Sequence, residues 1–394
     1  MASEAINRRD LEQFRLGKVS LVGFSHFMHD VYPAFLAPLI PLLIDKLGFS
    51  YSLAGVLIFC LRAPSLLNPV IGGLADKFDM RYALIFAPAF TAVMMSLGPL
   101  APGFGWLCVI LLMAGMSAAI YHVPSPVMIR HLSGSRIGTG MSIFMAGGEL
   151  ARTVGPIVII AAVELLGFEG SYPVMTLGLI TAIALYFAIR RVDPGGMVSG
   201  RGAIRNLKGA WQKNRRMFLL ILGIMSGRGF LMAALTLFLP AFMIERGSDL
   251  WIAGIALSAL ELAGVGGALG SGFFADKFGK KRVIIYMIIL TPALMLLFLV
   301  TSGALSFVML IFTGLALFAI TPIILAMVQS RENEFPASAN SIFMTLNFAV
   351  TSALALLFGA LGDVVSLEFA YYFSAAAGLI AIPFAIMLPG NSED

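Results

Sequence analysis

The stretches GGLADKFDMR (72–81) and GFFADKFGKK (272–281) decide how this chain is organised. Both contain the letters ADKF, and the copies lie 200 residues apart in a chain of 394. A second identity, SIFM at 142–145 and again at 341–344, has a spacing of 199. Two four-residue identities at nearly one offset predict that the chain consists of two copies of one structural unit.

Long apolar runs surround these repeats. The chain is 59% hydrophobic and 12% charged, whereas about a quarter of the residues in soluble domains are charged. A run of about 20 apolar residues is long enough to cross a membrane as a helix. Twelve such runs are found, at 19–44, 51–74, 82–101, 105–129, 138–163, 172–189, 217–244, 251–275, 283–301, 304–328, 337–361 and 367–388. We therefore predict an all-α membrane protein with twelve transmembrane helices in two pseudo-symmetric six-helix bundles.

The runs and the repeat together predict the domain boundaries. A segment 1–18 precedes a six-helix bundle at 19–189, and a linker at 190–216 leads to the second bundle at 217–388 and a tail at 389–394. The second half of the linker is basic and contains Trp211. It is either a solvated hinge or a short helix on an anionic membrane surface.

The distribution of basic residues predicts the orientation. Of the 26 Lys and Arg residues, 21 lie in the N-terminal segment, the linker and the loops after spans 2, 4, 8 and 10, while the opposite loops contain only Lys46 and Arg246. Because loops rich in Lys and Arg stay in the cytoplasm, both termini are expected there. The net charge of +5 follows from this bias, so no nucleic acid partner is expected.

The repeated loop resembles the G-x-L-a-D-[RK]-x-G-[RK]-[RK] motif of the major facilitator superfamily, although Asp79 stands at the second glycine of the first copy. The resemblance implies the fold of that superfamily and a latch on the cytoplasmic side. The residues that we expect to form this gating motif are Gly72, Asp76, Lys77, Arg81, Gly272, Asp276 and Lys277.

A closer resemblance is to the fosmidomycin-resistance branch of that superfamily. It rests on S-H-x2-H-D at 25–30, S-L-L-N-P-V-x-G at 65–72, His122 near a proline, and the glycine-rich segment 133–156. The branch consists of proton-driven exporters of small polar antibiotics, which implies antiport in a bacterial inner membrane. This chain departs from the branch at His29, Arg62, Glu149 and Arg152, which implies a different substrate.

Ionisable residues inside spans are costly and are candidates for function. His26, His29 and Asp30 have the i, i+3, i+4 spacing that places them on one helical face. We predict that Asp30 is the principal proton carrier, that both histidines adjust it, and that Glu149 is a second candidate. The alternative is a structural cluster that holds span 1 against a neighbouring helix.

Basic and polar residues in the spans predict a site for an anion. Glu149 and Arg152 are three residues apart, so they form either a structural ion pair or a pair that releases Arg152 to substrate when Glu149 is protonated. The predicted substrate-binding residues are Arg152, Arg228, His122, Arg62, Tyr121 and Asn347.

Three transport hypotheses follow. The first is proton-coupled export of a small, polar, anionic compound by alternating access. The second is transport of a divalent metal or metal chelate, with nitrogen and oxygen ligands from His26, His29, Asp30, His122 and Glu149. The third is proton-driven uptake of an organic anion. The sequence contains no nucleotide loop, HExxH or GxSxG motif, so we do not expect an enzyme. We also expect no cofactor and no resident metal. The expected partners are protons, a small-molecule substrate and the lipid bilayer, and the expected state is a monomer.

Overall fold

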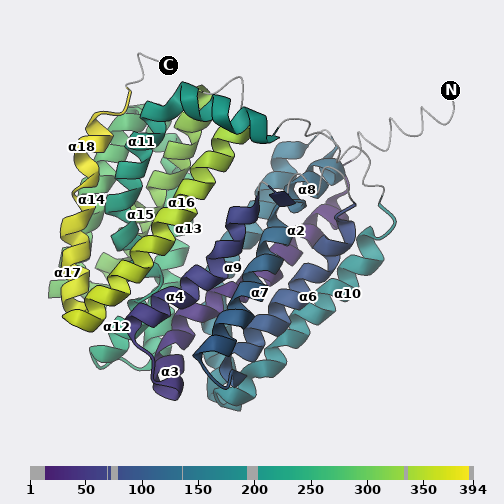
Figure 1. Cartoon of the computed structure of the whole chain (residues 1–394), viewed down its shortest axis with the longest axis horizontal. Coiled ribbons are helices and arrows are strands. Elements are labelled where there is room, and N and C mark those ends of the chain that lie inside the picture. The colour runs from purple at the N-terminus through teal and green to yellow at the C-terminus, as the bar shows by residue number, and fades with distance from the viewer. Residues whose placement is uncertain are drawn as a thin grey trace. The chain divides into compact units, whose positions relative to one another are not determined.

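The computed structural model describes residues 14–68, 70–71, 79–134, 136–192, 203–331 and 336–389. These residues form helices and the turns between them, with no strand (Figure 1). Ten helices in this part of the chain are long and apolar enough to cross a membrane, and the segment Tyr51–Leu67 is a shorter apolar helix. A helix bonds its own backbone groups, so it is stable where water is absent. The prediction of an all-α membrane protein is confirmed.

The contacts divide the chain into two compact units. The first unit contains the residues up to Leu36 together with Ala63–Arg201, and the second contains Ala37–Arg62 together with the residues from Gly202 onward. By these contacts the segment 37–62 groups with the second unit. The predicted boundaries of the two six-helix bundles stay predictions. The predicted linker residues 193–202 lie outside the described residues.

The first unit packs around helix α2. Its elements are α2 (Leu16–Val31), η1 (Pro33–Phe35), η2 (Ala63–Leu67), α6 (Arg81–Leu97), η3 (Gly98–Leu100), α7 (Phe104–His122), α8 (Ser125–Ser133), α9 (Ile137–Leu166), η4 (Glu169–Val174) and α10 (Met175–Ile189). Two glycines bring α2 and α9 close together, because a Cβ atom at Gly147 would lie 2.3 Å from the carbonyl oxygen of Gly23. Buried side chains that include Val22, Leu84 and Phe144 form the core.

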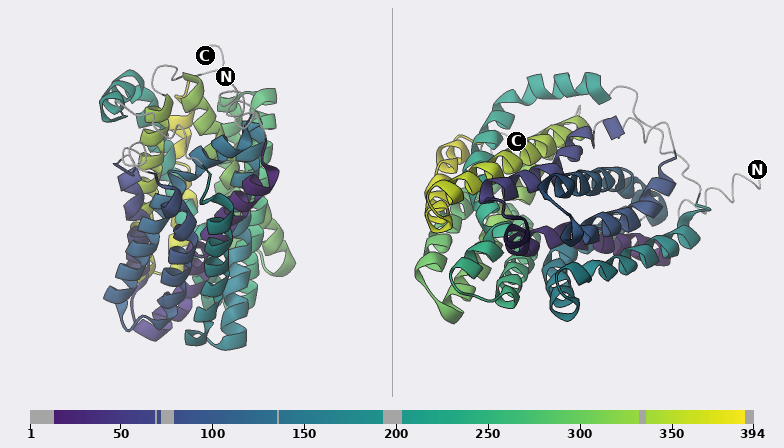
Figure 2. Two further views of the ribbon diagram at one scale, coloured as in Figure 1. Left: turned by 90° about the vertical axis from the view of Figure 1, so that its right-hand side faces the viewer. Right: turned by 60° about the horizontal axis from the view of Figure 1, so that its bottom comes forward.

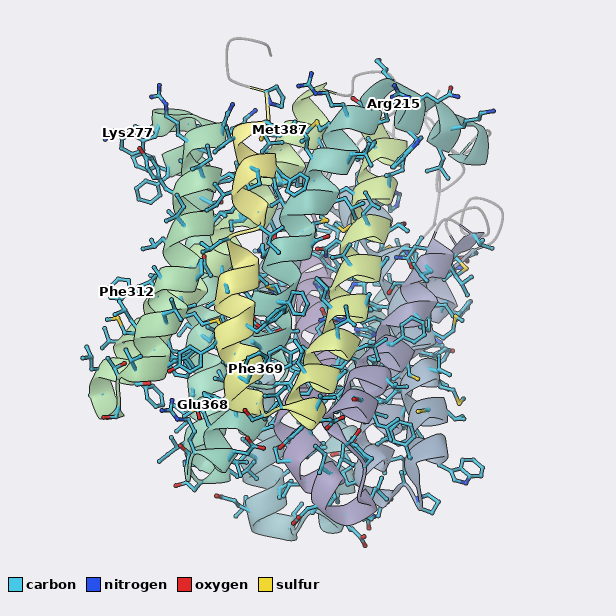
Figure 3. The ribbon with its side chains drawn as sticks, turned by 60° about the vertical axis from the view of Figure 1, so that its left-hand side comes forward. Arg215, Lys277, Phe312, Glu368, Phe369 and Met387 are labelled. Atoms are coloured by element: carbon cyan, nitrogen blue, oxygen red, sulfur yellow. The ribbon has the colours of Figure 1, made fainter. Side chains whose placement is uncertain are left out.

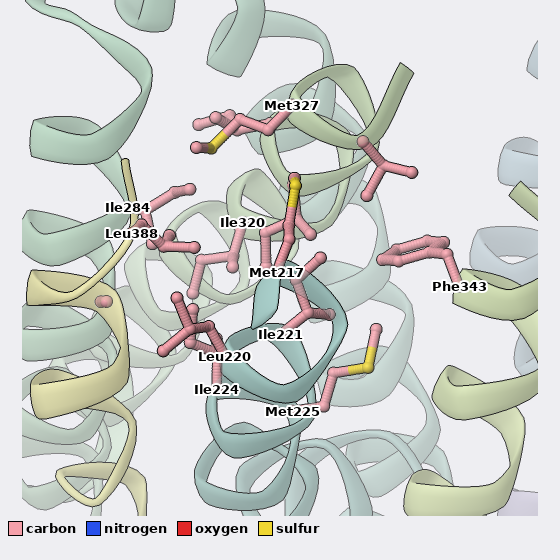
Figure 4. Close-up of a cluster of buried hydrophobic side chains, with 14 of the residues drawn as sticks. Met217, Leu220, Ile221, Ile224, Met225, Ile284, Ile320, Met327, Phe343 and Leu388 are labelled. Carbon is pink, nitrogen blue, oxygen red and sulfur yellow. The ribbon is translucent and has the colours of Figure 1, made fainter. Parts of the chain in front are cut away.

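The second unit has its own core. Its elements are α3 (Leu36–Leu47), α4 (Tyr51–Arg62), α11 (Ala203–Thr236), α12 (Leu239–Glu245), α13 (Leu250–Phe278), α14 (Lys280–Val300), α15 (Gly303–Arg331), α16 (Pro336–Val364), α17 (Leu367–Gly378) and α18 (Ala381–Ile386). Buried Ile221, Ile224, Ile320 and Phe343 are among the residues that pack together between α11, α14, α15 and α16 (Figure 4).

Helix α4 belongs to the second unit because it packs along α16. A Cβ atom at Gly359 would lie 2.2 Å from the carbonyl oxygen of Tyr51, and one at Gly55 would lie 2.8 Å from that of Ala355. At the start of α4, the carboxylate of Asp363 accepts hydrogen bonds from the backbone N–H groups of Tyr51 and of its neighbour Ser52, each at 2.7 Å. The carboxylate thus caps the first turn of α4 from another helix.

Candidate functional site

Four ionisable side chains meet inside the first unit. The carboxylate of Asp30, in the last turn of α2, lies 3.2 Å from His26 Nε2, 2.7 Å from His29 Nδ1 and 3.2 Å from His122 Nε2 at the end of α7. The structure thus brings together the three predicted residues of α2 and adds His122 to them. His26 and His29 are buried, whereas the side chains of Asp30 and His122 are 20% and 39% exposed.

The second ring nitrogen of His26 has a fixed role. Its Nδ1 lies 2.7 Å from the backbone oxygen of Phe144, and the imidazole stacks on the Phe144 ring with centroids 4.0 Å apart. A carbonyl oxygen only accepts, so Nδ1 carries a hydrogen and donates it. The remaining nitrogen, Nε2, is therefore the atom that presents either a lone pair or an additional proton to Asp30.

A chain of hydroxyl groups likewise determines which ring nitrogen of His29 carries a hydrogen. Ser117 Oγ donates to the carbonyl oxygen of Ala87 at 3.1 Å, and Thr91 Oγ1 donates to Ser117 Oγ at 2.8 Å. Both hydroxyl hydrogens are used, so His29 Nε2, 3.0 Å from Thr91 Oγ1, must be the donor in that contact. The nitrogen that faces Asp30, Nδ1, is again the one that lacks a hydrogen in a neutral ring.

These two assignments determine how many protons the cluster needs. In neutral rings, His26 Nε2 and His29 Nδ1 are acceptors, and each would face a carboxylate oxygen that is also an acceptor. Each contact therefore needs one proton, either on the ring or on Asp30. His122 can donate through Nε2 as a neutral ring. For both contacts to be hydrogen bonds, the cluster needs two protons more than an ionised Asp30 with three neutral histidines would supply.

Tyr121 packs against His29 of this cluster and is itself held by a hydrogen bond. Its ring stacks on His29 with centroids 4.3 Å apart, and its hydroxyl group hydrogen-bonds to Ser25 Oγ at 2.7 Å. Ser25 Oγ donates to the carbonyl oxygen of Val22, so the Tyr121 hydroxyl is the donor to Ser25. The Tyr121 side chain is completely buried, and its predicted contact with substrate stays a prediction.

Gly148 is a site residue that the sequence reasoning did not single out. A Cβ atom there would lie 2.5 to 3.1 Å from three ring atoms of His26, so only glycine leaves room for this ring position. The adjacent pair Gly147 and Gly148 in an otherwise apolar span was the available signal. Thr91 and Ser117 were also missed, because single hydroxyl residues in apolar spans commonly bond to their own helix.

The predicted pair of Glu149 and Arg152 is present on α9. Arg152 Nη2 donates to Glu149 Oε2, and their side chains are 41% and 28% exposed for Arg152 and Glu149 respectively. The pair lies just after Gly148, on the helix that also supplies the carbonyl group that binds His26. Its roles in coupling and in substrate binding stay predictions.

The predicted substrate residues of the second unit lie on three helices. Arg228 of α11 is 7% exposed, and its Nε and Nη2 donate to the carbonyl oxygen of Leu317 at 3.1 and 2.9 Å. Arg62, at the end of α4, donates to Thr351 Oγ1 at 3.3 Å, and the Thr351 hydroxyl donates to the backbone oxygen of Asn347 at 2.7 Å. No carboxylate is bonded to Arg228 among the residues that the structure describes.

The gating motif is only partly visible. Gly72, Asp76 and Lys77 lie outside the described residues. Arg81 pairs with Asp79 at 2.7 Å and also donates to the carbonyl oxygen of Val192, just beyond α10.

In the second copy, Asp276 is exposed, and Lys277 Nζ lies 5.4 Å from the centre of the Phe278 ring. A Cβ atom at Gly272 would meet no atom within 4 Å, so Gly272 makes no close helix contact here. Its role in gating stays a prediction.

The cluster also has the composition of a metal site. Ligand atoms of His26, Asp30 and His122 all lie within 4.8 Å of one another. Imidazole and carboxylate ligands suit a divalent transition metal, and ligating histidines commonly donate their second N–H to a backbone carbonyl group, as His26 does to Phe144.

Helices that span a membrane, with an ionisable cluster buried among them, are typical of a transporter. The sequence model of the protein family described as the Major Facilitator Superfamily matches residues 21–353 of this chain. The chain therefore belongs to the Major Facilitator Superfamily, and it is a secondary transporter rather than an enzyme.

Individual relatives agree with this assignment. The fosmidomycin resistance protein of Escherichia coli (strain K12) is 24% identical over 380 residues, which cover 95% of this chain and 93% of that protein. Among solved structures, a nucleoside transporter has a TM-score of 0.78 at 16% identity, covering 96% of this chain and 100% of the other. A bacterial homologue of the human lysosomal transporter Spinster has a TM-score of 0.79 at 14% identity, covering 94% and 95% of the two chains. The resemblance to the fosmidomycin-resistance branch is confirmed.

Proposed function

We propose that this chain is a proton-coupled antiporter that exports a small, polar, anionic compound by alternating access. The observation that supports proton coupling most directly is the cluster around Asp30. Its hydrogen bonds require two protons that an ionised carboxylate and neutral histidines do not supply. A group of side chains whose geometry depends on bound protons is suited to coupling proton movement to a change of conformation.

The coupling step follows from the contacts. With two protons bound, Asp30 bonds to His26 and His29, and these rings connect α2 to the Phe144 carbonyl group of α9 and to Thr91 of α6. Without the protons, two pairs of acceptors face each other at 3.2 and 2.7 Å and repel. Asp30 then has to move away from both rings. In this proposal the protons are exchanged at the partly exposed side chains of Asp30 and His122.

The proposed substrate is an anion because of the arginines. Arg228 is a buried cation bonded to a backbone carbonyl group, and a buried charge is stable only with a counter-charge. In the first unit, Arg152 would be available to an anion once Glu149 is protonated. The name of the Escherichia coli relative, a resistance protein, supports export. We further propose that the chain lies in a bacterial inner membrane as a monomer, with both termini cytoplasmic as the distribution of Lys and Arg predicts.

Asp30→Asn tests the proposal, because an amide cannot exchange a proton. In proteoliposomes under an imposed pH gradient, we expect the variant to lose proton-driven accumulation of an anionic test substrate while it retains substrate binding. Imposing the gradient in each direction separates export from uptake. Asp45→Asn, at an exposed aspartate of α3, is the matched control and should transport normally. Accumulation by Asp30→Asn at the wild-type rate would place the proton site elsewhere, with Glu149 the next candidate.

The second candidate function is transport of a divalent metal ion. It is favoured by the grouping of His26, Asp30 and His122 and by the hydrogen bond between His26 Nδ1 and the Phe144 carbonyl group. Calorimetry with Zn²⁺ and Mn²⁺ on wild type and on His122→Ala distinguishes the two functions. One ion bound per chain, lost in the variant, together with metal uptake into proteoliposomes, would favour the metal as substrate.

A further inference from the structure

We propose that the bent first part of α11, with the basic turn between α13 and α14, forms a docking surface for the headgroups of anionic phospholipids. The surface consists of Lys208, Lys213, Arg215, Arg216, Lys277, Lys280, Lys281 and Arg282, and we call it the basic face. All of these residues lie in the second unit. The proposal is independent of the transported substrate and of the cluster around Asp30.

Helix α11 is too long and too bent to lie entirely within a membrane. It runs over Ala203–Thr236, but Asn214 has non-helical backbone angles, with φ −115° and ψ 15°. Residues 215–236 are enough for one crossing, since about 20 helical residues span a hydrocarbon core. Residues 203–213 are thus left for the membrane surface, and Figures 1 and 2 show this part bent away from the remainder of α11.

Two contacts fix the bend. The ring of Trp211 stacks on that of Phe218, with centroids 5.7 Å apart and planes 2° apart. Seven residues of straight helix rise about 10.5 Å, so a stack at this distance fits a bent helix. The amide of Asn214 also donates to the carbonyl oxygen of Ala210 at 3.2 Å. The first part of α11 is therefore an ordered helical segment and not an extended linker.

The side chains of this element are arranged as on a helix at a membrane surface. Ala210 is fully buried against the protein, while Lys208, Lys213 and Arg215 are exposed. Trp211 is 38% exposed, and its amphipathic ring is suited to the headgroup level.

The second part of the basic face lies at the same end of the unit. Figure 3 shows Arg215 and Lys277 at one end, with Glu368 and Phe369 toward the other. Lys277 extends over the exposed rings of Phe273 and Phe278, with Nζ at 6.0 and 5.4 Å from their centres. The ammonium group of Lys277 is thus within cation–π distance of two exposed rings, and aromatic side chains beside basic ones are typical of a membrane interface.

The positive charge of the basic face indicates which class of lipid it would bind. Within the described segments 207–216 and 276–282, the eight residues of the basic face accompany one acidic residue, Asp276. Such an excess attracts phosphatidylglycerol or cardiolipin and gives no preference for a zwitterionic lipid.

Titration of the full-length protein in detergent with short-chain phosphatidylglycerol, and separately with short-chain phosphatidylcholine, tests the proposal. We expect saturable binding of the anionic lipid only, weakened by salt. Lys208→Gln should lower its affinity about fivefold, and Lys208→Gln combined with Arg215→Gln about thirtyfold. Glycerol phosphate, the free form of the headgroup, should not displace the lipid at equal concentration.

Lys46→Gln is the matched control, since Lys46 is an exposed lysine of α3 within the same unit. It should leave the affinity for phosphatidylglycerol unchanged. Unchanged affinity in the double variant, an equal loss in Lys46→Gln, or equal binding of phosphatidylcholine would overturn the proposal. Equal melting temperatures of all variants without lipid would show that folding is unaffected.

Discussion

At the scale of single residues, the position of His26 depends on a glycine. A methyl group at Gly148 would lie 2.5 Å from the His26 ring, much closer than an ordinary contact. We expect Gly148→Ala to push the ring away from Asp30 and to lower proton-driven transport about tenfold or more, with little change in expression. The measurement is the initial rate in proteoliposomes at several imposed pH gradients.

Gly105→Ala is the control for that variant. Gly105 lies in α7, and a Cβ atom there would meet no atom within 4 Å. It should therefore transport at the wild-type rate. Equal rates for Gly148→Ala and wild type would mean that the contact between His26 and Asp30 is not needed for coupling.

Arg228 is the residue on which the anion proposal depends most. Loss of a charge-assisted contact costs about 1.5–3 kcal/mol, so Arg228→Ala should weaken binding of an anionic substrate about ten- to hundredfold. Arg228→Lys should recover part of the loss, because it restores the charge without the planar fork. Equilibrium binding measures both variants.

Arg246→Lys is the matched control, since the guanidinium group of Arg246 also donates to a backbone carbonyl group, that of Leu299 at 3.2 Å. It should leave substrate affinity unchanged. If Arg228→Ala bound the anion as tightly as wild type, the substrate would have to find its counter-charge elsewhere.

The sequence predicted part of the cluster around Asp30. The spacing of His26, His29 and Asp30 was sufficient to place them on one helical face, because helical periodicity is local. The sequence could not show that His122 approaches the same carboxylate or that Thr91 fixes the role of His29. Those contacts depend on how α6 and α7 pack against α2, which no spacing within one helix reveals.

At the scale of helices, the contact between α4 and α16 depends on small residues. A Cβ atom at Gly359 would lie 2.2 Å from a backbone oxygen of α4, and neither backbone can move without separating the helices. Gly359→Ala should therefore lower the melting temperature by several degrees, since overpacking typically costs about 1–3 kcal/mol. Fluorescence-monitored thermal unfolding in detergent measures the shift.

Gly270→Ala provides the comparison within the same unit. A Cβ atom at Gly270 would make only an ordinary contact, 3.7 Å from Phe274. Alanine also has the higher helix propensity, so this variant should be as stable as wild type or slightly more stable. A melting temperature for Gly359→Ala equal to that of Gly270→Ala would show that α4 can move away from α16 without cost.

Helix boundaries were predicted less well than helix existence. The run at 138–163 corresponds to α9 over Ile137–Leu166. The run at 217–244 corresponds to parts of α11 and α12, and α11 begins at Ala203 because the basic residues before the span are also helical. Hydropathy predicts the apolar part of a helix, but it does not show whether the polar residues next to that part are also helical.

At the scale of the whole chain, the distribution of Lys and Arg residues predicts on which side of the membrane the termini and loops lie. We expect a reporter fused after Asp394 or within 198–209 to be cytoplasmic, and one inserted near Glu169 to be external, because 21 basic residues lie on one predicted side and two on the other. Alkaline phosphatase and fluorescent protein fusions measure the two locations. An external signal from the linker fusion would contradict the predicted orientation.

The sequence repeat and the packing divide this chain in different places. The repeat separates it near the linker at 190–216, whereas α4 packs along α16, which follows the linker. A backbone cut between residues 193 and 202 would therefore not produce two self-sufficient modules. The first fragment would contain α4 without α16, and the second would expose the face of α16 at Gly359 against which α4 packs. Two co-expressed fragments should therefore associate through the contact between α4 and α16, so that the chain would work as a split protein.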